Sequence, residues 1–277
     1  MAEEFTHLRK SKPVVLAAGL IWGMIAIAYS NTSHYEMVEH EIRHSFLEYT
    51  ELAFFLLVAM TYINALEERN VFNSLKSWLI KNQFSYRQLF WITGVLAFFL
   101  SPLADNLTTA LVLCAVVVAV GSSSPKFVGL ACVNIVVAAN AGGAFSPFGD
   151  ITTLMVWQAG QLDFLQFFAL VIPSIVNYII PASIMHFFVS DHKPDVAETS
   201  VTIKYGGKTI ILLGLLTIVT AVSFHNFLHL PPVFGMMTGL AYLQLYSFYI
   251  KISVKDIEEQ KYDFFENVAR VEWDTLL

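Results

Sequence analysis

One motif occurs twice in this chain, each time inside a long apolar stretch. Residues 101–109 read SPLADNLTT and residues 146–153 read SPFGDITT, so each copy has Ser-Pro, then Asp, then a pair of threonines. Proline and glycine interrupt helices, and a carboxylate is costly to place in a bilayer. Because the same costly interruption occurs twice, we expect both copies to serve one task. Broken membrane helices of this kind bind ions in secondary transporters.

The composition is that of an integral membrane protein. Of the 277 residues, 56% are hydrophobic and 14% are charged, whereas soluble domains carry roughly 25% charged residues. Both cysteines, Cys114 and Cys132, lie in apolar runs and are expected to pack as small hydrophobic residues. The chain has no basic patch that suggests nucleic acid, and no cofactor is predicted.

We therefore predict an all-α, polytopic membrane protein, because a spanning helix needs about 20 apolar residues. The third crossing is expected to be a discontinuous transmembrane helix over 126–160. Two arms within 88–121 reach only about 20–23 Å each at a helical rise of 1.5 Å, which favours a re-entrant hairpin. Residues 70–81 are expected to form an amphipathic surface helix. The six predicted crossings are 13–30, 48–66, 126–160, 164–190, 208–228 and 232–250.

The positive charges support the hairpin. With it, 15 of the 16 Lys and Arg residues fall in cytoplasmic segments, and only Arg43 lies outside. If a single crossing replaced the hairpin, the charges would divide 7 against 9, with no bias. The N-terminus is therefore predicted to be cytoplasmic.

Asp105 and Asp150 are the central site candidates, because they are the only acids deep inside apolar sequence. Burial disfavours a charged carboxylate, whereas a nearby cation favours it. Such a group can exchange a proton for a metal ion, and one site with two mutually exclusive occupants produces antiport. Each Asp can also cap the half-helix that follows it, and capping does not exclude this role.

Neutral oxygen atoms accompany both acids, and hard cations prefer oxygen ligands. Asn140 precedes Gly142 and Gly143, which permit unwinding and close backbone approach. Helix N-termini favour anions instead, so the residues alone leave an anion site open. The neutral groups predicted to complete the site are Asn106, Thr108, Thr109, Asn140, Ser146, Thr152 and Thr153.

The second predicted helix supplies two auxiliary candidates. Glu51 lies one turn deeper than Glu48 and is a candidate for ion entry or proton transfer. His44 is a candidate pH-responsive group, since histidine titrates near neutrality. Residues 40–44 read HEIRH, the zinc-protease pattern, but they lie in a polar segment expected outside the membrane, so zinc catalysis is not predicted.

The first motif, SPLADNLTTAL, and residues 133–153, VNIVVAANAGGAFSPFGDITT, together closely resemble the NhaD-type sodium/proton antiporters of the ion transporter superfamily. The resemblance covers nearly the whole chain. It implies exchange of sodium or lithium for protons across the bacterial inner (plasma) membrane. It also supports Glu51 and His44 as auxiliary residues. The positions it matches to the cation site are Asp105, Asn106, Asn140, Asp150, Thr152 and Thr153, with sodium at Asp105 and Asp150.

Members of that family resemble one another in having two inverted halves. We expect 1–190 to be a first repeat, with the hairpin at 88–121 and the broken helix at 126–160. We expect 191–277 to hold a cytoplasmic loop, two further membrane helices and a cytoplasmic segment that leads into a second repeat not present here, so the chain is expected to be partial. The expected partners are Na⁺ or Li⁺, H⁺ and the lipid bilayer, without nucleic acid; a homo-oligomer is compatible with such a chain.

Two other functions are compatible with parts of this pattern. An arsenite or carboxylate permease would share the fold, but its site should favour neutral or positive groups over two acids. An intramembrane protease would place its acids on intact facing helices, whereas both acids here lie in Ser-Pro breaks. The chain is therefore not expected to be an enzyme.

Overall fold

The computed structural model describes residues 11–82, 84–121, 124–193, 201–253, 263–271 and 273–276. These described residues contain helices and no strand, and seven helices among them are long and apolar enough to cross a membrane. The prediction of an all-α polytopic membrane protein is confirmed.

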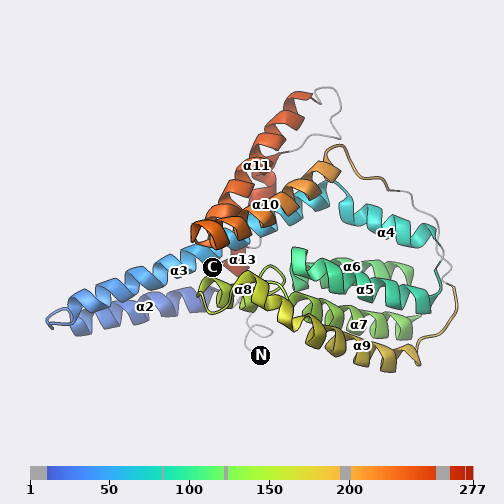
Figure 1. The fold of residues 1–277 in the computed structure, drawn as a ribbon, viewed down its shortest axis with the longest axis horizontal. Helices are drawn as coiled ribbons and strands as arrows, with labels where there is room; N and C mark the ends of the chain where they lie inside the picture. Colours follow the sequence, from blue (N-terminus) through green and yellow to red (C-terminus); the bar gives the residue numbers. More distant parts are fainter. Residues whose placement is uncertain are drawn as a thin grey trace. The chain divides into compact units, whose positions relative to one another are not determined.

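Figure 1 shows the helices as ribbons coloured along the chain. Their order is α2 (Ser11–Tyr29), α3 (Tyr35–Glu68), α4 (Val71–Lys81), α5 (Tyr86–Ala104), α6 (Asn106–Val120), α7 (Pro125–Gly143), α8 (Ile151–Gln158), η1 (Phe164–Leu170), α9 (Val171–His186), α10 (Gly207–Leu228), α11 (Pro232–Ser253), α12 (Phe264–Ala269) and α13 (Trp273–Leu276).

The chain divides into two compact units. The first unit comprises Met1–Asn64, Leu213–His225 and Leu230–Leu277, and the second comprises Ala65–Leu212 with Asn226–His229. Both motif copies lie in the second unit. These units differ from the two parts expected from sequence, 1–190 and 191–277, which describe the repeats of a longer transporter. That division stays a prediction.

In the second unit, α5 and α6 form an antiparallel hairpin. At its open end, Tyr86 stacks on Phe127 with ring centroids 4.3 Å apart, and Gly121 packs against the same Phe127 ring. At its closed end, the N–H of Asn106 donates to the carbonyl of Gly149, beyond the end of α7 (3.0 Å). α5 therefore runs parallel to α7, and α6 returns antiparallel to both. The hairpin is present, and its re-entrant position in a bilayer stays a prediction.

The open end of the hairpin is fastened to the end of α9. Ser85 and Gln88 form a capping box at the start of α5, and the Ser85 hydroxyl donates to Asp191 (2.8 Å). The N–H of Tyr86 donates to the carbonyl of His192 (2.9 Å). These contacts close a core of α5, α6, α7 and α9 whose buried members include Phe90, Leu113, Phe127, Ile135 and Tyr178.

Two helices differ in length from their predicted bounds. α5 does not stop at Leu100 but continues through Pro102 to Ala104, because a proline in the last turn removes only one helical hydrogen bond. α3 starts at Tyr35 rather than near Glu48. Its first turns contain no proline or glycine, and Arg43 pairs with Glu39 one turn earlier (2.8 Å). The break between α7 and α8 and the helix α4 occur where they were predicted, and their positions relative to a membrane stay predictions.

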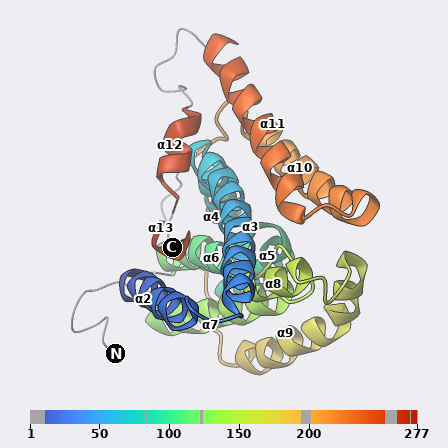
Figure 2. The ribbon, with the colours of Figure 1, turned by 90° about the vertical axis from the view of Figure 1, so that its left-hand side faces the viewer.

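In the first unit, α3, α10 and α11 pack through small residues and one buried tyrosine. Figure 2 shows the ribbons of α10 and α11. Gly235 lies against the backbone of Ala221, and Gly239 lies against the side chain of Thr217. The buried Tyr62 hydroxyl donates to the carbonyl of Gly239 (2.7 Å) and accepts from Thr217 (2.9 Å). Small residues that allow close approach are the usual basis of helix packing in lipid, where no hydrophobic force drives helices together.

We predict that Tyr62→Phe destabilises the protein by about 1–2 kcal/mol, because it removes the donor to Gly239 and the acceptor for Thr217 from a buried site. The measurement is thermal unfolding in detergent. Thr238→Val is the matched control, since the Thr238 hydroxyl bonds only to its own helix at Phe234. Equal melting temperatures for the two variants would show that Tyr62 does not connect these helices.

Candidate ion site at two helix breaks

The two motif copies meet at the closed end of the α5–α6 hairpin and the α7–α8 break. The side-chain amide of Asn106, in the first copy, donates both to the carboxylate of Asp150 in the second copy and to Asn140 Oδ1 (3.1 Å). Together with the bond from its N–H to Gly149, this residue makes three hydrogen bonds across the breaks. Segments 45 residues apart in sequence are thus in direct contact.

Asp105 is the single residue between α5 and α6. Its backbone has φ 55° and ψ 160°, a combination that residues other than glycine rarely adopt and that costs about 1–3 kcal/mol. Its carboxylate accepts from the N–H of Thr108 and from the Thr108 hydroxyl, both at 2.8 Å. Asp105 therefore caps α6 and turns the chain back with no intervening loop.

Asp150 caps the second half-helix in the same way. One carboxylate oxygen accepts from the N–H of Thr152 (2.8 Å) and from its hydroxyl (2.6 Å), and the other accepts from Asn106. The capping expected from sequence is confirmed for both acids. Both residues are half-buried. Each carboxylate therefore accepts hydrogen bonds from N–H and hydroxyl donors and is still partly exposed.

Asn140 orients the amide of Asn106. Its nitrogen donates to the carbonyl of Val136, one turn back in α7 (2.8 Å), so its oxygen faces Asn106. The nitrogen of Asn106 must therefore point toward Asn140, and the same nitrogen reaches Asp150. A helix carbonyl thus determines the orientation of two consecutive amides, both of which were predicted as site residues.

The remaining predicted hydroxyl groups have different surroundings. The Thr153 hydroxyl is within hydrogen-bond distance of the carbonyls of Ser146 (2.9 Å) and Asp150 (2.8 Å). The Ser146 hydroxyl donates to the carbonyl of Pro102 in the other copy (2.9 Å). Thr109 is buried, and its hydroxyl has no partner among the described residues. Thr153 and Ser146 thus hold the second break in shape.

Glycines allow the two breaks to approach one another. A Cβ on Gly143 would lie 2.6 Å from the carbonyl oxygen of Gly149 and 3.1 Å from the Ser101 hydroxyl. Gly142 lies against the carbonyl of Phe98, which has no helical donor because Pro102 follows four residues later. The close approach predicted for Gly142 and Gly143 is confirmed. α7, however, stays helical through both glycines and ends at Gly143.

Ser101 is a site residue that the sequence analysis missed. It is fully buried, and its hydroxyl donates to the carbonyl of Ala139 in α7 (2.6 Å). The available signal was its position, since Ser101 opens the first motif copy as Ser146 opens the second.

Glu51 and His44 lie on α3 in the first unit, and their auxiliary roles stay predictions. His44 is exposed, and its Nδ1 lies 3.6 Å from Glu48. Its ring stacks on that of His40 with centroids 6.3 Å apart. In the described part of the chain, no group of three His, Cys, Asp or Glu side chains is placed to hold a metal ion, so the HEIRH segment gains no third zinc ligand there.

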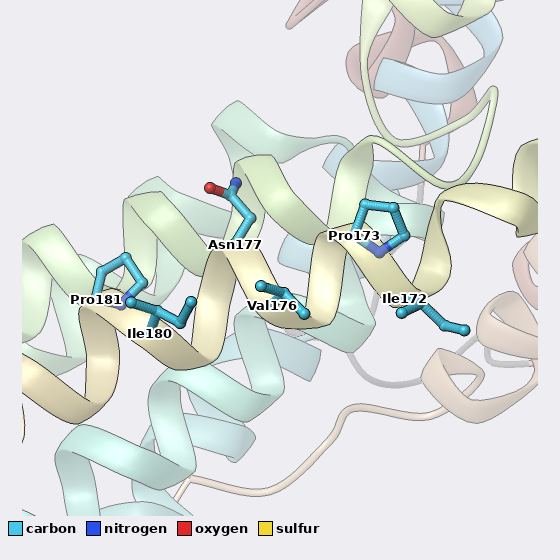
Figure 3. Close-up of a pocket in the computed structure, with 6 residues that line it drawn as sticks. All are labelled: Ile172, Pro173, Val176, Asn177, Ile180 and Pro181. Carbon is cyan, nitrogen blue, oxygen red and sulfur yellow. The ribbon is translucent and has the colours of Figure 1, made fainter.

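A pocket elsewhere in the second unit has different chemistry. One face of α9 lines it, and Figure 3 shows Asn177 as the only polar side chain among its labelled residues. Its lining contains no carboxylate, whereas the two breaks contain Asp105 and Asp150. Its lining residues are Ile172, Pro173, Val176, Asn177, Ile180 and Pro181.

A multi-pass helical protein with two polar breaks in contact has the architecture of a secondary transporter. Residues 7–277 match the family model described as citrate transporter. The chain is 52% identical to the Na(+)/H(+) antiporter NhaD of Vibrio cholerae, 51% identical to that of Vibrio parahaemolyticus and 31% identical to sodium/proton antiporter 1 of Arabidopsis thaliana. The chain belongs to the citrate transporter family and, within it, to the NhaD-type antiporters.

The matches cover 100%, 98% and 87% of this chain, respectively. They cover 62% of the V. cholerae protein, 70% of the V. parahaemolyticus protein and 42% of the Arabidopsis protein. The chain thus spans about 62% of the length of the first of these relatives. The resemblance noted in the sequence is confirmed, and it places the chain among transporters rather than enzymes.

We predict that Gly143→Ala destabilises the protein by about 1–3 kcal/mol, because the added methyl group meets the Gly149 carbonyl and forces the breaks apart. Gly129→Ala on the same helix is the control. A Cβ there meets nothing within 4 Å, and alanine is the better helix former. The measurement is thermal unfolding of both variants in detergent, and a Gly143→Ala variant as stable as Gly129→Ala would contradict the close packing.

Proposed function

We propose that this chain carries the cation site of a secondary transporter that exchanges Na⁺ or Li⁺ for H⁺. The observation that carries the proposal is the hydrogen bond from Asn106 to Asp150. This bond joins Asn106, the residue that follows Asp105, to Asp150. The relatives named as Na(+)/H(+) antiporters support the same function.

The proposed exchange follows from the chemistry of the two carboxylates. A half-buried carboxylate is stabilised either by a bound proton or by a nearby cation, and occupancy by one disfavours the other. At Asp150, one oxygen is held by Thr152 and the other by Asn106. A sodium ion that approaches this carboxylate must share or displace the Asn106 amide. Asn106 is therefore proposed to bind when its oxygen turns toward the ion, with the oxygens of Asp105, Asn140, Thr152 and Thr153 completing the site.

A cation fits these helix ends better than an anion does. Helix N-termini attract anions through unpaired N–H groups. Here the Asp105 carboxylate occupies the N–H of Thr108, and the Asp150 carboxylate occupies that of Thr152. An incoming anion would meet two negative side chains at the positions where it should find donors.

Transport of a carboxylate such as citrate is the second candidate, because the matching family model is described as citrate transporter. Such a substrate would need positive or neutral groups at the breaks. The charged residues within the two motif copies are both carboxylates, Asp105 and Asp150. The site chemistry therefore favours cation exchange.

The proposed setting is a bacterial inner membrane with a cytoplasmic N-terminus. The family and the seven apolar helices make the protein a multi-pass membrane protein. The distribution of 15 of 16 Lys and Arg residues supports this orientation and a re-entrant α5–α6 hairpin. In this orientation, the Asp105 turn would reach the membrane centre from the cytoplasmic side.

We predict that Asp150→Asn abolishes sodium-dependent proton movement, because an amide cannot alternate between a proton and a cation. Asp105→Asn should have the same effect. The measurement is dequenching of a pH-sensitive dye in everted vesicles that contain the protein. Asp163→Asn is the control, because Asp163 caps η1 outside both breaks. Exchange at the control's rate in Asp150→Asn vesicles would refute the assignment.

We also predict that proton movement depends on Na⁺ or Li⁺ and is unchanged when chloride is replaced by citrate. The same vesicles are assayed with sodium chloride, sodium citrate and potassium citrate. Movement with potassium citrate equal to that with sodium salts would instead support the carboxylate transporter.

A further inference from the structure

The serines that open the two motif copies each bond to the opposite break. Ser101, at the end of α5, donates to the Ala139 carbonyl in the last turn of α7 (2.6 Å). Ser146, in the α7–α8 break, donates to the Pro102 carbonyl at the end of α5 (2.9 Å). Serines in membrane helices usually bond to their own helix, so two reciprocal bonds to the partner break are a feature of this site.

The Ser146 bond satisfies a backbone group that the α5–α6 break leaves open, whereas the Ser101 bond adds to a carbonyl inside α7. In an uninterrupted helix, the N–H of Asn106 would bond to the carbonyl of Pro102. That N–H donates instead to Gly149, and the Pro102 carbonyl receives the hydroxyl of Ser146. An unpaired backbone group in lipid costs several kcal/mol. Each break therefore supplies the hydrogen bond that the other has lost.

Burial and packing fix the two hydroxyls in this arrangement. Ser101 is fully buried and Ser146 is 8% exposed. The Ser146 oxygen also accepts from the N–H of Phe148 (3.2 Å), which directs its proton toward Pro102. A Cβ on Gly143 would approach the Ser101 hydroxyl to 3.1 Å, so the hydroxyl packs closely against Gly143.

We infer that Ser101 and Ser146 are positioning residues that form a reciprocal brace and hold Asp105 and Asp150 in one cation site. This inference rests on the proposed function for its sodium readout. It adds a residue, Ser101, and it gives Ser146 the role of a brace in place of a cation ligand. Loss of either hydroxyl should loosen the opposite break as well as its own, and should weaken sodium binding without removing any carboxylate.

The test compares Ser101→Ala and Ser146→Ala with Ser101→Thr and Ser146→Thr, which keep the hydroxyl. Thr93→Val is the control, because Thr93 is a buried residue of α5 whose hydroxyl bonds only to its own helix. Two quantities are measured in detergent. One is the sodium concentration that gives half-maximal thermal stabilisation, and the other is amide hydrogen exchange in 103–109 and 146–153.

Each alanine variant should need about 3- to 10-fold more sodium, which corresponds to one net hydrogen bond. Ser146→Ala should speed exchange in 103–109, and Ser101→Ala should speed exchange in 146–153, each by about 3- to 10-fold. The threonine variants and Thr93→Val should remain near the unmodified protein. Ser146→Cys, with a weaker donor of similar size, provides the same comparison if the alanine variant does not fold.

An unchanged sodium requirement in both alanine variants overturns the positioning role, even if exchange is faster. A raised sodium requirement with unchanged exchange in the opposite break also overturns the brace, because it makes the serine a direct ligand. If the unmodified protein shows no response to sodium, the proposed function fails, and the exchange measurement still decides whether the two breaks brace one another.

Discussion

The structure of the second unit depends on two helix breaks that satisfy each other's backbone. An interrupted helix leaves N–H and C=O groups without partners, and lipid offers none. Here the N–H of Asn106 uses the carbonyl of Gly149, and the carbonyl of Pro102 uses the hydroxyl of Ser146. Each break thus pairs a backbone group that the other cannot pair within its own helix. Their mutual hydrogen bonding explains why the same motif occurs twice.

The caps add charge to this arrangement. A serine or threonine would cap α6 and α8 without placing an anion in a low-dielectric environment. Both positions are instead aspartate, and each carboxylate accepts from the threonine that follows within the first turn. The cap donors are hydrogen-bond partners that a negative charge at either position would need. A cation would then replace an interaction already present, which keeps binding reversible.

The sequence predicted the features that depend on local chemistry. Apolar length located the helices, Ser-Pro and Gly-Gly located the breaks, and the position of each Asp before a half-helix indicated the caps. The pairing of particular atoms could not be predicted, because it depends on how α5 and α7 pack. Ser101 was missed for this reason, since a serine in an apolar helix normally bonds backwards to its own turn. The length of α3 was underestimated because its charged first turns contain Arg43 and Glu39, which stabilise a helix only once they are paired.

The hydrogen bonds of Asn106 also connect the proposed cation site to the closed end of the hairpin. Asp150 is bonded by Asn106, and Asn106 is bonded through its backbone to Gly149, the residue just before Asp150. An ion that draws the Asn106 amide from the carboxylate therefore acts on a residue whose backbone closes the hairpin against the second break. Asp105 is the only residue between α5 and α6, and its backbone is already strained, so a shift of the Asn106 backbone would act directly on Asp105. In the proposed cation site, occupancy at Asp150 would therefore be felt at Asp105 through Asn106, which follows Asp105 in the chain and donates its side-chain amide to Asp150.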